Sequence, residues 1–215
     1  MDAEFLHDLR LPLQLIQSGA QMARLALDDP GLNPSEYLDM VAENAAQLRR
    51  MLDGAMAEAG GAPRRVDAVA VVRGLCRRCS GYARERGVAL AFRANVDALP
   101  VLLDEDRLSR AVLNLMMNAL RFTPAGGRVA AGLRALGDFV EITVEDDGPG
   151  VAPERLPYLF VRGETTGGSG YGLPAAMDCA RALGGSLTAA LRQSGGMAFT
   201  LRVPLGVARR VGSCG

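Results

Sequence analysis

Residues 139–150 read Phe-Val-Glu-Ile-Thr-Val-Glu-Asp-Asp-Gly-Pro-Gly, and this stretch does most to indicate the fold. Its β-branched and apolar residues predict a strand over 139–145. The strand ends in acidic residues, and the glycines at positions 148 and 150 would let the backbone approach a ligand closely. A carboxylate in this place can accept a hydrogen bond from an exocyclic amine, although an ordinary turn explains the same residues equally well.

Helix and strand patterns alternate on both sides of this stretch. We expect helices over 66–86, 104–121 and 173–183, and further strands over 88–94, 128–134, 186–192 and 197–204. The last strands follow one another at hairpin spacing, so the sheet should be mixed rather than purely parallel. The pattern predicts an α/β sandwich.

The first 59 residues show a helical pattern instead. A helix over 4–27 carries an apolar stripe with spacings of three and four residues, a turn-rich segment follows at 28–34, and a second helix spans 35–58. Both helices have apolar faces too broad for one hairpin to cover. A second copy of the chain would cover them in a dimeric four-helix bundle, and packing against the rest of the chain is the alternative.

The expected fold class is therefore α+β. We expect a helical hairpin at 1–59, a linker at 60–65 that contains Gly60-Gly61-Ala62-Pro63, an α/β sandwich at 66–206 and a flexible tail at 207–215.

Composition narrows the possible functions. The 24 basic and 24 acidic residues cancel, which argues against binding to nucleic acid or a membrane surface by bulk charge. All basic residues are arginines, so a lysine nucleophile is excluded, and a single histidine excludes a two-histidine metal site within one chain. Cys76 and Cys79 lie one turn apart in an expected helix and lack the further ligands of a zinc site. We see no signal peptide and no membrane-length apolar run, and we expect a cytoplasmic protein.

Three further motifs carry chemistry. The glycine-rich residues 167–173 open a helix, and free backbone donors there can bind an anion, although the spacing fits neither a P-loop nor a dinucleotide fingerprint. Asn114 and Asn118 share one face of an apolar helix, where they would either ligate Mg²⁺ through oxygen or make side-chain caps and water contacts. His7 lies one position past the apolar stripe, so it should face solvent, and Asp8 follows it directly.

Together these motifs resemble those of the two-component sensor histidine kinases. The resemblance covers residues 4–205 and implies a dimerisation and histidine-phosphotransfer hairpin followed by an ATP-binding domain of the gyrase, chaperone and mismatch-repair superfamily. The matching segments, in family order, are the H box at 7–13, the N box at 114–123, the first glycine box at 147–150, a reduced F box at 159–160 and the second glycine box at 168–173.

The resemblance implies a role for each matching residue. His7 would take the γ-phosphoryl group of ATP, with Asp8 as a base or orienting carboxylate. Asp147 would bind the adenine amino group in a pocket that Gly148 and Gly150 shape. The other implied nucleotide contacts are Asn118 and Asn114 through Mg²⁺, Arg121 at the phosphates, Phe122 against the base, Arg162 in the lid, and Gly168, Gly170, Gly172 and Leu173 at the lid hinge and helix start.

The implied function is an ATP-dependent protein histidine kinase that autophosphorylates and passes the phosphoryl group to an aspartate of a response regulator receiver domain. The implied partners are a second copy of the chain and, because few residues precede His7, a separate or truncated sensor.

Two alternative functions remain open. One is an ATPase of the same superfamily, which is disfavoured because Asn114 stands where those relatives carry a glutamate, and the other is a phosphotransfer scaffold with a degenerate ATP domain. Two departures from the family are Leu11, which predicts weak phosphatase activity, and Ala198, where relatives often carry a threonine.

Overall fold

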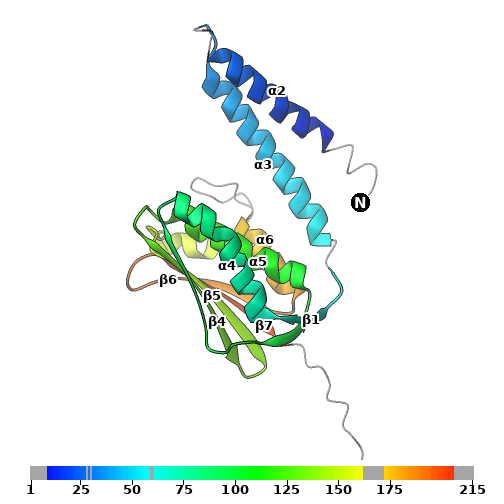
Figure 1. The fold of residues 1–215 in the computed structure, drawn as a ribbon, viewed down its shortest axis with the longest axis vertical. Coiled ribbons are helices and arrows are strands. Elements are labelled where there is room, and N and C mark those ends of the chain that lie inside the picture. The colour runs from blue at the N-terminus through cyan, green and yellow to red at the C-terminus, as the bar shows by residue number, and fades with distance from the viewer. Residues whose placement is uncertain (1–8, 28, 30, 59–60, 162–171, 206–215) are drawn as a thin grey trace, which may run out of the picture. The chain divides into compact units, whose positions relative to one another are not determined.

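The computed structural model describes residues 9–27, 29, 31–58, 61–161 and 172–205 (Figure 1). The chain divides into two compact units, Met1–Ala59 and Gly60–Gly215.

The first unit is a hairpin of two helices, α2 (Arg10–Ala26) and α3 (Pro34–Glu58). The turn between them positions α3, because the Asn33 side chain accepts a hydrogen bond from the backbone N–H of Ser35. The helices approach closely at Gly19, where an added Cβ would lie 2.8 Å from Cγ2 of Val41. Small side chains thus bring the two backbones together.

The face of α2 that packs in the hairpin differs from the predicted stripe. The buried residues of α2 are Pro12, Gly19, Ala23 and Ala26. The predicted stripe consists of Leu6, Leu9, Leu13, Ile16, Ala20, Ala23 and Leu27. Of these, Ala23 is buried, whereas Leu13 and Leu27 are exposed, with 45% and 75% of their surface accessible. The small residues contact α3 because they permit close approach, and this leaves leucines outside. Among the side chains that the structure describes in the hairpin, the exposed leucines are Leu11, Leu13, Leu25, Leu27 and Leu38.

The second unit is built on a five-stranded sheet. Its strand order is β2 (Ala89–Ala94), β4 (Arg128–Leu136), β5 (Phe139–Asp146), β7 (Met197–Pro204) and β6 (Ser186–Leu191). β2 pairs with β4 in parallel, and every other pairing in this sheet is antiparallel. The predicted mixed sheet is confirmed.

Three helices cover one face of this sheet (Figure 1). They are α4 (Ala68–Glu85), α5 (Glu105–Phe122) and α6 (Gly172–Ala182). α5 begins where Asp104 accepts hydrogen bonds from the backbone N–H groups of Asp106 and Arg107. This helix is the central one, because it contacts both α4 and α6 and also lies against β4 and β5. None of the helices described is long and apolar enough to cross a membrane.

Two short strands and one short helix were not expected from the sequence. β1 (Arg64–Asp67) and β3 (Pro100–Leu103) form an antiparallel pair, so the helix expected from residue 66 begins at Ala68 instead. A strand of four residues is too short to show a clear periodic pattern in the sequence. These two strands form because each supplies the backbone hydrogen-bond partners of the other. The 3₁₀-helix η1 (Pro153–Tyr158) follows the glycine-rich turn after β5.

The alternation of side chains along β5 positions the functional site. Val140, Ile142 and Val144 are buried on the helix-facing side of the sheet, and the next residue in this alternation is Asp146 at the end of the strand. The neighbouring strand β7 presents Met197 and Phe199 in the same way. An acidic side chain thus enters the space between the sheet and α5.

Candidate functional site

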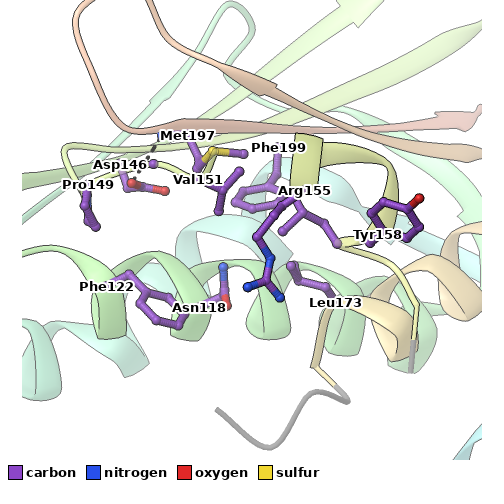
Figure 2. A pocket seen from close by; sticks show the side chains of 12 residues that line it. Asn118, Phe122, Asp146, Pro149, Val151, Arg155, Tyr158, Leu173, Met197 and Phe199 are labelled. Carbon is purple, nitrogen blue, oxygen red and sulfur yellow. Dashed lines mark hydrogen bonds between the residues drawn. The ribbon is translucent and has the colours of Figure 1, made fainter. Parts of the chain in front are cut away.

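A cavity of about 240 Å³ lies between the ends of β5 and β7 and the helix α5, bordered by η1 and the start of α6 (Figure 2). Its wall is largely apolar with a few polar side chains, as is common for small-molecule sites. The residues that line it are Asn118, Phe122, Asp146, Pro149, Gly150, Val151, Arg155, Tyr158, Leu159, Leu173, Met197 and Phe199.

Asp146 is the acidic residue of the cavity. Its side chain is 3% exposed, and Oδ1 accepts hydrogen bonds from the backbone N–H of Gly148 at 2.8 Å and of Met197 at 3.3 Å (Figure 2). Burial raises the pKa of this carboxyl, and the two backbone donors and Arg192 oppose that shift only in part. The arrangement holds a carboxylate in a fixed orientation with its acceptors available to a ligand.

The prediction for Asp147 is wrong in its placement. Asp147 is exposed and does not line the cavity, since the next residue along a strand points to the opposite face. The Asp147 carboxylate accepts a hydrogen bond from the backbone N–H of Arg128 and forms an ion pair with Arg192 at 2.8 Å. The hydrogen bond from the Arg192 side chain is the main cause that lowers the pKa of Asp147. Asp146, and not Asp147, is therefore the acidic side chain at the cavity.

The glycines of the turn after β5 are required by close packing. A Cβ on Gly148 would lie 2.7 Å from Oδ1 of Asp146, and Gly150 has a φ of +68°, which favours glycine. Gly150 also lines the cavity. Gly148 instead packs against Asp146, and the roles that the resemblance implied for these two glycines stay predictions.

The helix α5 contributes the opposite wall. Asn118 and Phe122 line the cavity one turn apart, and the exposed Arg121 has its guanidinium carbon 5.7 Å from the centre of the Phe122 ring. Asn114 does not line the cavity, but its Nδ2 is buried without a hydrogen-bond partner. A buried amide donor of this kind is costly unless a ligand supplies the acceptor.

The start of α6 lies beside Asn114. Leu173 lines the cavity, and a Cβ on Gly172 would lie 3.9 Å from Oδ1 of Asn114. The glycine-rich segment that precedes α6 contains Arg162, Gly168 and Gly170, which lie outside the described residues, as do His7 and Asp8. Their predicted roles stay predictions.

Ala198, where relatives often carry a threonine, lies outside the cavity wall. Ala198 is paired with Glu145 and does not line the cavity, whereas its neighbour Met197 does. Met197 supports Asp146 through its backbone N–H rather than through a side-chain hydroxyl. The alanine at position 198 therefore removes no side chain from the cavity wall.

Sequence reasoning missed Arg155 altogether. The resemblance implied a role for Arg162 in the lid but none for Arg155, although both lie between Gly150 and Gly168. The structure places Arg155 in the cavity wall (Figure 2). Of the twelve residues that line the cavity in the described part of the chain, Arg155 alone is cationic. The basic residue itself was visible in the sequence, but its orientation was not.

The chain is similar to proteins of a known family. The family model for histidine kinase-, DNA gyrase B- and HSP90-like ATPases matches residues 103–207. The sensor protein TorS of Escherichia coli K12 is 33% identical over 94% of this chain and 23% of TorS. The signal transduction histidine-protein kinase/phosphatase MprB of Mycolicibacterium smegmatis is 31% identical over 84% of this chain and 39% of MprB.

The chain spans less than half the length of these two curated relatives. Among solved structures, that of the histidine kinase ThkA in complex with the response regulator protein TrrA matches 94% of this chain and 60% of the ThkA chain. The TM-score is 0.69 at 20% sequence identity, so this similarity shows the fold alone.

Proposed function

This chain belongs to the two-component sensor histidine kinases as a catalytic, ATP-binding region, and from that premise we propose that it is an ATP-dependent histidine kinase that autophosphorylates on His7. In that reaction a histidine ring nitrogen forms a bond to the γ-phosphorus while the bond from that phosphorus to the bridging oxygen of ADP breaks. An aspartate of a response regulator would then accept the phosphoryl group. The known complex of ThkA with a response regulator supports this class of partner.

The observation that carries the proposal is the buried carboxylate of Asp146. Two backbone donors occupy Oδ1, so the carboxylate has acceptor capacity left for a ligand donor. The amino group of adenine is such a donor, whereas guanine presents an acceptor at the same ring position. Apolar residues beside Asp146, among them Val151, Met197 and Phe199, suit the faces of a planar base.

The polar residues of α5 fit a magnesium ion and phosphates. Asn118 offers an amide oxygen in the cavity. Asn114 lies one turn earlier on α5, and its buried Nδ2 has no hydrogen-bond partner among the described residues. Mg²⁺ is usually held by few protein ligands together with substrate phosphates, and when bound it neutralises phosphate charge. The described residues contain no cluster of three or more His, Cys, Asp or Glu that would provide a different metal site.

Incubation of the full chain with radiolabelled Mg-ATP tests the proposed function. A histidine kinase yields protein-bound label that is stable to alkali and labile to acid. Release of free phosphate without protein label would instead favour an ATPase, and neither product would favour a scaffold with an inactive ATP domain. Asn114 argues against the ATPase, since an amide cannot act as the general base that activates water.

We expect Asn118→Ala to lower the rate of autophosphorylation by about two orders of magnitude, the scale of losing one group that stabilises developing charge. The cause would be loss of the metal-binding amide oxygen, so adenosine binding without Mg²⁺ should persist. Autophosphorylation measured across a Mg²⁺ titration checks this. An unchanged Mg²⁺ dependence in the variant would contradict the metal role of Asn118.

We also propose that the hairpin forms a homodimer. Several leucines of the described hairpin are exposed, and a second hairpin that covers such side chains would bury them in a four-helix bundle. In sedimentation, the full chain should therefore be a dimer, and a fragment of residues 60–215 should be a monomer that still binds nucleotide, because that unit has its own core. A dimeric fragment would contradict the assignment of the interface to the hairpin.

A further inference from the structure

We infer that Arg155 binds a phosphate group of the nucleotide, a role that rests on the ATP-binding function proposed above. The residue lies on η1, which follows the glycine-rich turn after β5. The helix is anchored because Leu156 and Leu159 pack against the hydrophobic core. Arg155 thus projects from a supported element, and its side chain is half-buried.

The direction of the side chain is the first argument. Figure 2 shows Arg155 crossing the cavity from η1 toward α5, with its guanidinium at the level of Asn118 and Leu173. If the base occupies the Asp146 end, the phosphates extend toward Asn118 and the start of α6. The guanidinium therefore lies on the phosphate side of the cavity.

Charge is the second argument. Arg155 is the cationic member of the cavity wall, as described above, and a triphosphate entering that wall needs neutralising charge. A planar guanidinium can donate two parallel hydrogen bonds to phosphate oxygens, which an ammonium group cannot do in a fixed geometry.

Equilibrium binding of ATP, ADP and adenosine, measured by calorimetry without Mg²⁺, tests this role. For Arg155→Ala we expect the Kd of ATP and of ADP to rise by about 10- to 100-fold, as for the loss of charge-assisted hydrogen bonds. The Kd of adenosine should change by less than about two-fold, because adenosine has no phosphate. Arg155→Lys should lie between, since it keeps the charge and loses the bidentate geometry.

Arg181→Ala is the matched control. Arg181 lies on α6, is 72% exposed and pairs with Asp178 at 3.8 Å, and this substitution makes the same charge change outside the cavity wall. It should leave all three Kd values unchanged. If Arg155→Ala does not fold, as judged by circular dichroism, the same titrations are made with Arg155→Lys. The Kd of ATP and of ADP should again rise more than the Kd of adenosine.

Two results would overturn the role of Arg155. An equal loss of affinity for adenosine and ATP would mean that the side chain only supports the pocket, and no loss for ATP would mean that it does not contact phosphate. Failure of the proposed function looks different, because the unmodified chain would then bind neither adenosine nor ATP.

Discussion

His7→Gln should abolish the acid-labile, alkali-stable label that the chain acquires from radiolabelled Mg-ATP. His7 is the sole histidine of the sequence, so no second imidazole can accept the phosphoryl group. Glutamine keeps a polar side chain of similar length but has no nucleophilic ring nitrogen. The measurement is the amount of protein-bound label after gel separation and treatment with acid or alkali.

Nucleotide binding provides the control for this variant. The ATP-binding unit is compact by itself, so His7→Gln should leave the Kd of ATP unchanged. Residual label with the same acid and alkali behaviour in the variant would show that another group is phosphorylated. That result would remove His7 from the proposed reaction while leaving the ATP site intact.

Asp146→Asn should weaken ATP binding by about 100-fold, since losing a charge-assisted hydrogen bond and placing an amide donor against the adenine donor costs about 3 kcal/mol. The backbone N–H groups of Gly148 and Met197 both donate to Oδ1 and would orient the amide oxygen toward themselves. The amide nitrogen would then face the adenine amino group, donor against donor. Calorimetric titration with ATP measures the change.

Asp147→Asn is the matched control for this prediction. It makes the same chemical change one residue along the chain, on a side chain that pairs with Arg192 outside the cavity. We expect nearly normal ATP affinity for it. A severe loss with Asp147→Asn and none with Asp146→Asn would reverse the assignment that the structure makes.

The same Asp146 substitution should stabilise the protein without nucleotide. Burial raises the pKa of Asp146, so the folded state favours the protonated carboxyl, and this contribution to stability is present at low pH and lost as the pH rises through the raised pKa. At neutral pH the ionised side chain carries the desolvation cost, which asparagine avoids. Thermal unfolding should therefore show a higher Tm for Asp146→Asn at pH 7, and the difference should shrink in acid.

Much of the architecture could be predicted from sequence because it depends on local pattern. The strand over 139–145 and the helix over 104–121 have clear periodicity, and the structure contains both within one residue at each end. The mixed sheet followed from the hairpin spacing of the last strands. The asparagine pair on α5 and the glycines after β5 were also visible, because chemically distinctive residues stood at regular offsets.

The choice between Asp146 and Asp147 was available in the sequence but was made wrongly. Motif matching selected Asp147, whereas the alternation of Val140, Ile142 and Val144 selects Asp146, because each second residue of a strand faces the same side. The same rule selects Met197 over Ala198 on β7. Periodicity along a strand thus decides which neighbour enters the cavity when a motif contains two candidates.

The sequence by itself determined the layered α/β unit, the preceding hairpin and the presence of a nucleotide-type site, since periodic burial and glycine-rich turns are local properties of the chain. Only the tertiary structure decided which side chains meet. It paired β1 with β3, packed the face of α2 that carries glycine and alanine against α3, and turned Arg155 toward Asn118. These outcomes depend on contacts between residues far apart in the chain, and no local pattern records the direction in which a side chain crosses a cavity.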